Sequence, residues 1–423
     1  MLIFLKIGEN IYFMNKEGER CLNRSCDIQL NGISIISLTL WIYAIAAVVT
    51  DEGSMLMKLS RLLLLGVFCI CLCIKKKLQH NAYILCMGIF CVVAACSANW
   101  AINKTYANAM GKTLLINLAC MYALFYIIDS KRERIEELLK AFVIAPLFLE
   151  LRVIATGGLF AFSSVRKAGS INGNTVGVCA AFGLCFAIYF ILKGQSKRWF
   201  RFLAFANLLV VILSSSRKAI LCFIIPLAMI YVFDNKDNIV KNASKIIVVL
   251  FVAIIGYYAL LHVPFLYSMA GHRIESMIAG MLGTDAVVDS STSTRLNLIQ
   301  WGLEWFKERK WLGYGIDNYR FVLHSYHSNW SLAYYAHNNY VELLVDVGLI
   351  GTIAYYFNYI KMIVISVTNV RKVTKTELLF IGILVALLIG EYGLVTYYDK
   401  YVQVVLVIIW MFIVPLKNEK YKG

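Results

Sequence analysis

The sequence predicts an all-α polytopic membrane protein with about 12 transmembrane helices and one long extracytoplasmic loop that contains amphipathic helices. Three observations predict this fold class. Of the 423 residues, 60% are hydrophobic and only 16% are charged, which leaves too little polar surface for a soluble globular protein. Apolar runs of membrane-spanning length recur along the chain, and basic residues concentrate in alternate connections between them. One long polar segment interrupts this pattern at residues 263–337.

The apolar runs give the predicted helices in chain order. They lie at residues 33–50, 58–74, 82–98, 112–129, 140–157, 175–193, 199–215, 218–233, 245–262, 339–366, 377–397 and 401–416. The predicted organisation is therefore an N-terminal segment (1–32), transmembrane helices 1–9 (33–262), the long loop (263–337), transmembrane helices 10–12 (338–416) and a C-terminal tail (417–423). The positive-inside rule places both termini in the cytoplasm and the loop outside.

Composition also argues against a nucleic-acid partner and against a disulfide framework. The net charge of +16 follows from topology, because basic residues concentrate in the connections predicted to be cytoplasmic, so no nucleic-acid partner is expected. The 12 cysteines lie mostly in apolar runs, and the long loop has none, which argues against a disulfide framework.

Three of the charged residues within apolar runs call for an explanation. Glu150 and Arg152 lie in the fifth run and Glu391 in the eleventh, where a charge is costly to bury in lipid. Two interpretations stay open. The side chains either pair with neighbouring helices or the membrane interface, or they line a substrate path.

Two short outer connections carry basic residues against the topological bias. The loop Ser163–Asn174 is rich in Gly, Ser and Asn, contains Arg166, and ends at Asn174 or Thr175 as the expected helix cap. The turn Ser214–Leu221 places Arg217 and Lys218 in the first turn of the next helix, where the helix dipole disfavours cations unless an anion binds there. Ordinary contacts with lipid headgroups are the alternative for both.

The long loop contains one amphipathic helix from about Ser293 to Lys310, with Arg295 expected in its first turn. The stretch Trp311–Tyr319, which includes Tyr314, then turns the chain. Four of the eight tryptophans and six tyrosines fall between residues 263 and 337. Such aromatic residues suit either a membrane-interface belt or stacking against sugar rings.

His337 closes the long loop next to the start of an apolar helix near Asn339. A histidine of ordinary pKa is mostly neutral at neutral pH and can accept a proton from a hydroxyl group, so His337 is a candidate general base. A structural or capping role is the alternative. Glu342 has a capping-box-like spacing from Asn339, which favours a structural role for its carboxylate.

Four elements in order resemble the O-antigen ligase and O-antigen polymerase superfamily of bacterial membrane glycosyltransferases, and the resemblance covers roughly residues 160–355. They are the basic loop Arg166–Asn174, the element Arg217-x-x-x-Leu221, Arg295 at a helix start followed by Gly313 to Gly315, and His337-x(10)-Gly348.

The resemblance implies that a glycan is transferred from an undecaprenyl-pyrophosphate (polyprenyl-pyrophosphate) carrier to an acceptor glycan or lipid. The reaction is expected on the outer face of the bacterial cytoplasmic (inner) membrane, in the assembly of O antigen, capsule or exopolysaccharide. The expected partners are these substrates, membrane lipids and other polysaccharide-assembly membrane proteins. A polymerase is preferred, and the alternatives are an O-antigen ligase of the same superfamily and a transporter or flippase of lipid-linked oligosaccharides.

The predicted site residues follow from the charge that develops on the leaving pyrophosphate. Arg217 and Arg295 are the expected catalytic cations, because a guanidinium donates two parallel hydrogen bonds and stays charged, and His337 is the expected base. Substrate-binding roles are expected for Arg166, Lys218, Asn174 and Tyr314. The outer loops contain no Asp-x-Asp element, so neither a metal nor another cofactor is expected.

Overall fold

The computed structural model describes residues 5–7, 11–14, 20–23, 28–30, 33–157, 167–168, 171–214, 216–234, 239–264, 267, 275 and 290–417. Each of the predicted apolar runs overlaps one helix within this part of the chain. These helices are α1 (Ile35–Val49), α2 (Met55–Lys75), α3 (Ala82–Cys96), α4 (Lys104–Ile128), α5 (Arg132–Gly157), α7 (Gly173–Leu192), α8 (Lys197–Leu213), α9 (Arg217–Phe233), α10 (Ile239–His262), α15 (Asn339–Thr368), α16 (Lys375–Glu391) and α17 (Lys400–Ile413).

Six segments are long and apolar enough to cross a membrane in the described part of the chain, so the protein is an integral membrane protein. They are α2, α3 with its short extension η1 (Ser97–Asn99), α4, α7, α10 and α15. Large apolar side chains point outward on α2 and α10, among them Leu62, Phe251 and Ile254, each more than half exposed. A surface of this kind requires a covering of lipid or protein. The count of about 12 spans stays a prediction.

The remaining described elements are shorter. Two helices, α13 (Ser290–Glu308) and α14 (Tyr319–Tyr326), occupy the end of the long polar segment, and the turns η3 (Val370–Lys372) and η4 (Val414–Lys417) follow α15 and α17. The sequence did not predict the strands β1 (Leu5–Ile7), β2 (Ile11–Met14), β3 (Arg20–Asn23), β4 (Ile28–Leu30), β5 (Ile33–Ser34), β6 (Lys167–Ala168) and β7 (Ile171–Asn172). They pair antiparallel in the orders β1-β4-β5, β2-β3 and β6-β7.

The chain divides into two compact units. The first unit comprises residues 1–84, 116–219 and 400–411, and the second comprises residues 85–115, 220–399 and 412–423.

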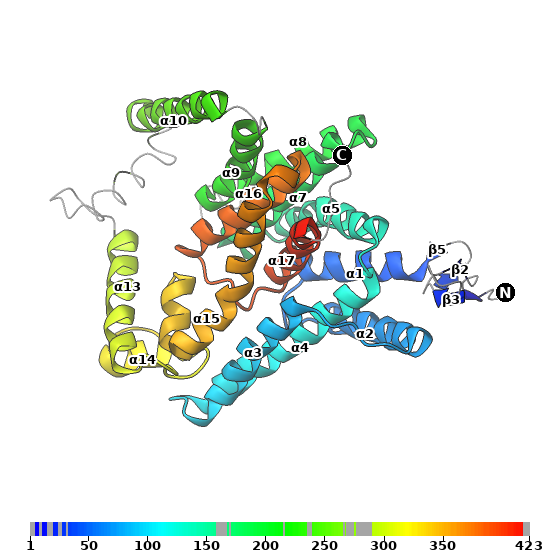
Figure 1. Cartoon of the computed structure of the whole chain (residues 1–423). Coiled ribbons are helices and arrows are strands. Elements are labelled where there is room, and N and C mark those ends of the chain that lie inside the picture. The colour runs from blue at the N-terminus through cyan, green and yellow to red at the C-terminus, as the bar shows by residue number, and fades with distance from the viewer. Residues whose placement is uncertain are drawn as a thin grey trace. The chain divides into compact units, whose positions relative to one another are not determined.

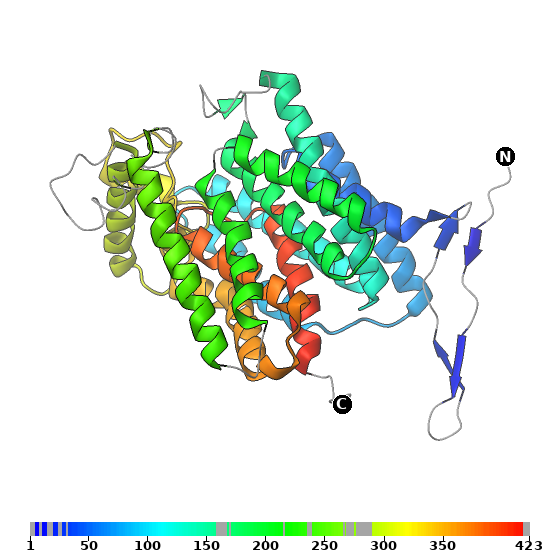
Figure 2. The same cartoon turned by 90° about the horizontal axis from the view of Figure 1, so that it is seen from above.

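The core of the first unit is built on α5, which packs against α1, α7 and α8 (Figures 1 and 2). The buried amide of Asn207 on α8 donates to the carbonyl oxygens of Val143 and Leu203, each at 2.9 Å, and so ties α8 to α5. A Cβ on Gly183 of α7 would lie 2.6 Å from Asn207 Oδ1, so glycine allows the two helices to approach closely. These contacts fix the start of α7, where one of the predicted site loops ends.

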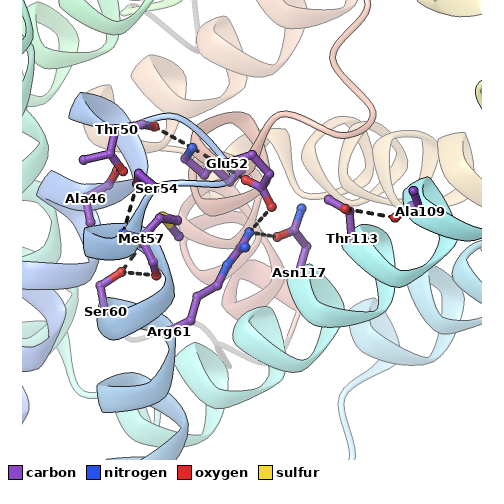
Figure 3. A network of polar contacts seen from close by, with 11 residues as sticks. Ala46, Thr50, Glu52, Ser54, Met57, Ser60, Arg61, Ala109, Thr113 and Asn117 are labelled. Atoms are coloured by element: carbon purple, nitrogen blue, oxygen red, sulfur yellow. Dashed lines mark hydrogen bonds and ion pairs between the residues drawn. The ribbon is translucent and has the colours of Figure 1, made fainter. Parts of the chain in front are cut away.

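A polar network holds the connection between α1 and α2 in the same unit (Figure 3). The buried guanidinium of Arg61 donates to Glu52 and to Asn117 Oδ1, the latter at 2.6 Å. Lys400 Nζ donates to the carbonyl oxygen of Thr50 at 2.6 Å. The network explains how charged side chains are accommodated in apolar segments, because each reaches a polar partner.

The two charged residues of the fifth apolar run, Arg152 and Glu150, have different surroundings in the structure. Arg152 Nη2 lies 2.8 Å from Asp51 Oδ2, and its Nη1 donates to the carbonyl oxygen of Val49 at 2.6 Å, so this pair joins α5 to the end of α1. Glu150 is buried, and its Oε2 has no hydrogen-bond partner among the described residues. The pairing expected of Glu150 with another helix is therefore not seen for this oxygen, and Arg152, expected to reach the outer interface, pairs with the end of α1.

In the second unit, α13 and α14 both pack against α15 (Figure 1). Their shared core contains Leu298, Trp305, Tyr319 and Leu323, all buried. Since α15 is apolar and α13 is amphipathic, the packing buries the apolar face of α13 against α15. This arrangement positions the candidate site.

Candidate functional site

His337 lies immediately before α15 in an unusual backbone conformation. Its φ angle is +55°, in the left-handed region that non-glycine residues seldom adopt. Asn338 caps the helix, because its Oδ1 accepts a hydrogen bond from Val341 N at 3.1 Å. The backbone of His337 is therefore strained, as is common at functional positions, and it holds the imidazole at the start of a helix.

Glu342 fixes the chain on the other side of His337. Its buried carboxylate accepts a hydrogen bond from Ala336 N at 2.7 Å. The prediction that Asn339 and Glu342 form a capping-box pair is wrong, because the cap is Asn338 and Glu342 bonds to the loop before it. Both neighbours of His337 are thus held by hydrogen bonds, and these bonds compensate the strain.

A second buried network anchors the start of α15 to the segment after α16. Asn339 Oδ1 accepts hydrogen bonds from Thr396 N and Tyr397 N at 2.9 and 3.2 Å, and its Nδ2 donates to Tyr356 Oη at 2.8 Å. Tyr356 in turn donates to Glu391 Oε2 at 2.7 Å. Glu391 therefore accepts hydrogen bonds inside the protein and does not line an open path, in agreement with the structural interpretation of this residue.

Gly348 explains why the element that begins at His337 ends in glycine. Its φ angle is +64°, which interrupts the helical conformation of α15, and a Cβ there would lie 2.4 Å from the backbone of Trp311. Leu349 N donates to Lys310 O at 2.8 Å, so the turn after α13 binds at the break in α15. Gly313 lies in the same contact, where a Cβ would approach Asp346 O to 2.5 Å. Only glycine allows two backbones to come this close.

Asp346 lies two residues before the break in α15 and orients α14. Its buried carboxylate accepts hydrogen bonds from the backbone N–H groups of Asp317, Asn318 and Tyr319 at 2.7, 3.1 and 2.7 Å. It therefore caps α14 from another helix, since Asn318 makes no side-chain cap. The turn and α14 are fixed relative to His337 through residues of one helix.

Tyr335 brings further charged groups into the neighbourhood of His337. Its ring centroid lies 3.9 Å from that of the imidazole. Burial and the charge of Glu342 raise the pKa of Tyr335, whereas the nearby Arg295 lowers it. Asp399 and Arg320 act on the same pKa in opposite directions, the first raising and the second lowering it. The ring of Tyr335 therefore contacts His337, and its pKa responds to the charges of two arginines and two carboxylates.

Arg295 belongs to this group, but its place on the helix differs from the prediction. The helix α13 begins at Ser290, so Arg295 lies in the second turn and not in the first. The prediction failed because the serine- and threonine-rich stretch Ser290–Thr294 is helical, although such residues favour caps. The guanidinium is therefore disfavoured less by the helix dipole than a cation in the first turn would be.

Arg320 is a candidate residue that sequence reasoning missed. Its Nη2 lies 2.8 Å from Asp317 Oδ1, and its guanidinium carbon lies 5.9 Å from the centre of the Tyr106 ring. Burial raises the pKa of Asp317, and the charge of Arg320 opposes this rise. The spacing Asp317-x-x-Arg320 in the polar segment was the available signal, because residues three apart share one helix face.

The predicted turn between α8 and α9 lies in the first unit, at residues 214–219. Ser216 caps α9 as expected, with its Oγ accepting from Ala219 N at 3.3 Å, so Arg217 and Lys218 open the helix. No acidic residue lies in this first turn. Asn174 joins the turn, since its Oδ1 accepts a hydrogen bond from Ser216 Oγ at 3.0 Å.

The expected cap of the preceding site loop is corrected by the structure. Asn172, and not Asn174 or Thr175, caps α7, because its Oδ1 accepts from Asn174 N at 3.0 Å. Gly177 allows this helix to approach the turn, since a Cβ there would lie 2.3 Å from Ser214 Oγ. The side chain of Asn174 is thereby free of a capping role and reaches Ser216.

The remaining predicted site residues fall in different places. Arg166 lies outside the described residues. Tyr314 is buried in the turn after α13, and its hydroxyl donates to Glu308 Oε2 at 2.8 Å. The second unit thus brings together His337 and Arg295, and the first unit brings together Arg217, Lys218 and Asn174.

The group around His337 has the components of an acid–base site for anionic substrates. An imidazole can accept a proton from a hydroxyl group, and arginines can stabilise phosphate charge. In the first unit, the start of α9 by itself combines helix N–H groups with two basic residues, a combination suited to phosphate.

A comparison with protein families matches part of the chain. Residues 202–356 match the family model described as O-antigen ligase. The matched range contains Arg217, Arg295, His337 and Gly348, and it excludes Asn174 and Arg166. Among curated proteins, none matches the sequence significantly. The resemblance predicted from the motifs is confirmed over this range, which is similar to the O-antigen ligase family.

Proposed function

We propose that the protein is a polysaccharide polymerase that acts on O antigen, capsule or exopolysaccharide in the bacterial cytoplasmic membrane. It transfers glycan from a polyprenyl-pyrophosphate carrier, such as undecaprenyl pyrophosphate, to a sugar hydroxyl of the acceptor on the outer face. The helices are proposed to cross the membrane about 12 times with both termini in the cytoplasm.

The observation that carries the proposal is the group around His337 within the range matched to the O-antigen ligase family. His337 contacts Tyr335, and Arg295 and Arg320 lie close enough to Tyr335 to lower its pKa. A proton acceptor beside cations is what glycosyl transfer from a pyrophosphate requires.

In the proposed reaction, the acceptor hydroxyl oxygen attacks the anomeric carbon of the donor glycan. The bond between that carbon and the pyrophosphate oxygen breaks, its electron pair stays on the pyrophosphate, and the hydroxyl proton passes to His337. Arg295 and Arg217 are proposed to stabilise the charge that develops on the two phosphates. Lys218, Asn174, Arg166 and Tyr314 are proposed to bind the substrates.

The arginines are proposed to replace a divalent metal. The transfer rate should therefore be unchanged by EDTA when the protein is assayed in purified, reconstituted form. A loss of activity on chelation, restored by a divalent ion, would contradict this part of the proposal.

An O-antigen ligase is the second candidate, because the matched family model carries that description. The two activities differ in the acceptor. Gel analysis of surface polysaccharide from a deletion strain separates them. Single-repeat products indicate a polymerase, whereas long chains left on the lipid carrier indicate a ligase.

The reconstituted protein separates either enzyme from a transporter. Proteoliposomes are supplied with lipid-linked repeat units on the outer leaflet, so that growth of glycan chains requires no translocation. Chain growth by the wild type and its loss in His337→Ala support the proposal. His262→Ala is the matched control, because His262 is an exposed histidine at the end of α10, just before the same polar segment. Translocation of labelled lipid without chain growth would overturn the proposal.

A further inference from the structure

Six aromatic side chains in the second unit form a continuous array beside the candidate site. Trp301 and Trp305 lie on α13, Tyr326 ends α14, and the others follow in the loop before His337. The aromatic array consists of Trp301, Trp305, Tyr326, His327, Trp330 and Tyr334.

Ring contacts connect the array from one end to the other. Trp305 stacks with Tyr326 at 5.5 Å, and His327 stacks on Trp301 at 3.9 Å between ring centroids. Trp305 also lies 6.3 Å from His327, which joins these two pairs. Trp330 meets Trp301 edge-on at 5.4 Å and Tyr334 at 4.9 Å. The rings are therefore fixed by one another and not scattered over the surface.

Backbone hydrogen bonds brace the loop that carries the outer rings. Trp330 N donates to His327 O at 3.0 Å, and Tyr334 N donates to Ser331 O at 3.1 Å. Since the loop is braced, a ligand that stacks on these rings meets a surface that is already ordered, which lowers the entropic cost of binding.

The two ends of the array are exposed to solvent. Tyr326 is 51% exposed and Tyr334 is 38% exposed, whereas the rings between them are buried or half-buried. Tyr334 directly precedes Tyr335, whose ring contacts His337. The array therefore continues into the proposed catalytic group.

Polar groups lie along the array, which argues against a purely lipid-facing surface. Glu308 accepts hydrogen bonds from Tyr326 and Tyr314, and these hydroxyls lower the pKa of Glu308, so it stays a carboxylate at neutral pH. His324 is exposed beside Trp330 and its Nδ1 lies 3.1 Å from Trp330 O. Lipid chains do not solvate a carboxylate, whereas sugar hydroxyls donate hydrogen bonds to one.

We propose that the aromatic array binds the acceptor glycan, with sugar rings stacked on Trp330 and Tyr334 and the sugar hydroxyls near Glu308 and His324. The inference rests on the proposed function for the identity of the ligand and adds its binding surface. Sugars present apolar C–H faces and polar edges, and rigid aromatic rings with polar neighbours match both. The array thus guides a chain of several sugars towards His337.

The test measures binding apart from transfer. Full-length protein in lipid nanodiscs is titrated with a soluble oligosaccharide of several repeat units, released from the producing organism's own surface polysaccharide. Trp330→Ala and Tyr334→Ala should each weaken binding by about tenfold, as expected for central aromatic contacts. Trp330→Phe keeps a ring and should recover most of the affinity, which controls for misfolding.

Leu332→Ala is the matched control. Leu332 is 41% exposed in the same loop but is not aromatic, so its replacement should leave oligosaccharide binding unchanged. If Leu332→Ala and Tyr334→Ala weaken binding to the same extent, stacking is not the cause and the inference is wrong.

Three further outcomes separate this inference from the proposed function. His337→Ala should keep wild-type oligosaccharide affinity while it loses transfer, because the base does not belong to the array. If the array variants bind normally although the wild type transfers glycan, the array is not the acceptor site. If brominated lipid quenches Trp330 fluorescence, by comparison with Trp330→Phe, and oligosaccharide does not protect it, the array anchors the protein in the membrane and the inference is overturned.

Discussion

Helices α9 and α15 begin at the elements Arg217-x-x-x-Leu221 and His337-x(10)-Gly348. The two helix starts differ in charge. Helix α9 opens with Arg217 and Lys218 and has no acidic residue in its first turn. Helix α15 opens after His337 and has Glu342 in its first turn, where a carboxylate suits the helix dipole. The two helix starts therefore carry charges of opposite sign in their first turns.

This difference suggests a division of roles between the two regions. The start of α9 combines cations with helix N–H groups, as phosphate-binding sites do. The start of α15 holds one imidazole in a left-handed conformation through hydrogen bonds on both sides. Phosphate binding is thus expected at Arg217 and proton transfer at His337, and the following changes test this division.

The largest effect is expected for His337→Ala. Loss of a general base should lower turnover on the order of 10²–10⁴-fold, while the protein still inserts into the membrane. Chain growth on lipid-linked repeat units, measured with purified protein, checks this. A variant that polymerises at the wild-type rate would show that His337 is structural.

Arg217→Ala should cost roughly 3–4 kcal/mol of transition-state stabilisation, because an arginine on a phosphate donates two hydrogen bonds. Arg217→Lys should recover only part of this, since lysine keeps the charge but not the bidentate geometry. The ratio kcat/KM for the lipid-linked donor is the measurement, and the exposed Arg201→Ala serves as the control. Full rescue by lysine would favour an interfacial anchor.

Gly348→Ala should act through structure and not through chemistry. The added Cβ would meet the Trp311 backbone at 2.4 Å in a left-handed conformation, so the contact between the break in α15 and the turn after α13 must open. We expect a loss of roughly 2–4 kcal/mol in stability. Thermal unfolding in detergent measures it, with Gly390→Ala as the control, because that site has no atom within 4 Å of the added Cβ. Equal melting temperatures for the two variants would contradict the close contact.

The smallest effect is expected for Glu308→Gln. Hydrogen bonds from Tyr326 and Tyr314 lower the pKa of Glu308 below its ordinary value of 4.5. Its contribution to stability is therefore present above that ordinary value and is lost as pH falls through the lowered pKa of the folded state. The melting temperature of the variant should fall below that of the wild type by a few degrees near neutral pH and converge with it in acid. A difference that grows as pH falls would contradict the assignment.

Sequence reasoning predicted the helices well, because membrane-spanning helices need long apolar runs and these are visible one by one. The run at 218–233 became α9 at Arg217–Phe233, and the serine cap before it followed from local preference. The short strands at the N-terminus were missed, since such short pairs leave little periodicity to detect.

The candidate site was predicted less completely. His337, Gly348 and Arg217 lie in local elements with characteristic spacing and could be selected directly. Arg320 was missed although its partner Asp317 lies only three residues away, and the hydrogen bond from Ala336 N to Glu342 could not be assigned because it depends on how the loop before α15 folds. The cap of α7 was misplaced from Asn172 to Asn174 for a similar reason, since several asparagines in one loop have equal local preference.

The sequence by itself determined that the chain is a helical membrane protein and where its basic and histidine-containing elements lie, because lipid selects for apolar length and helix starts select for polar caps. Only the tertiary structure decided that Gly348 interrupts α15 to receive the turn after α13, and that Asp346 orients α14 from there. It also decided that Tyr335, Arg295 and Arg320 gather near His337. Such contacts join residues far apart in the chain, so they depend on packing and not on local preference.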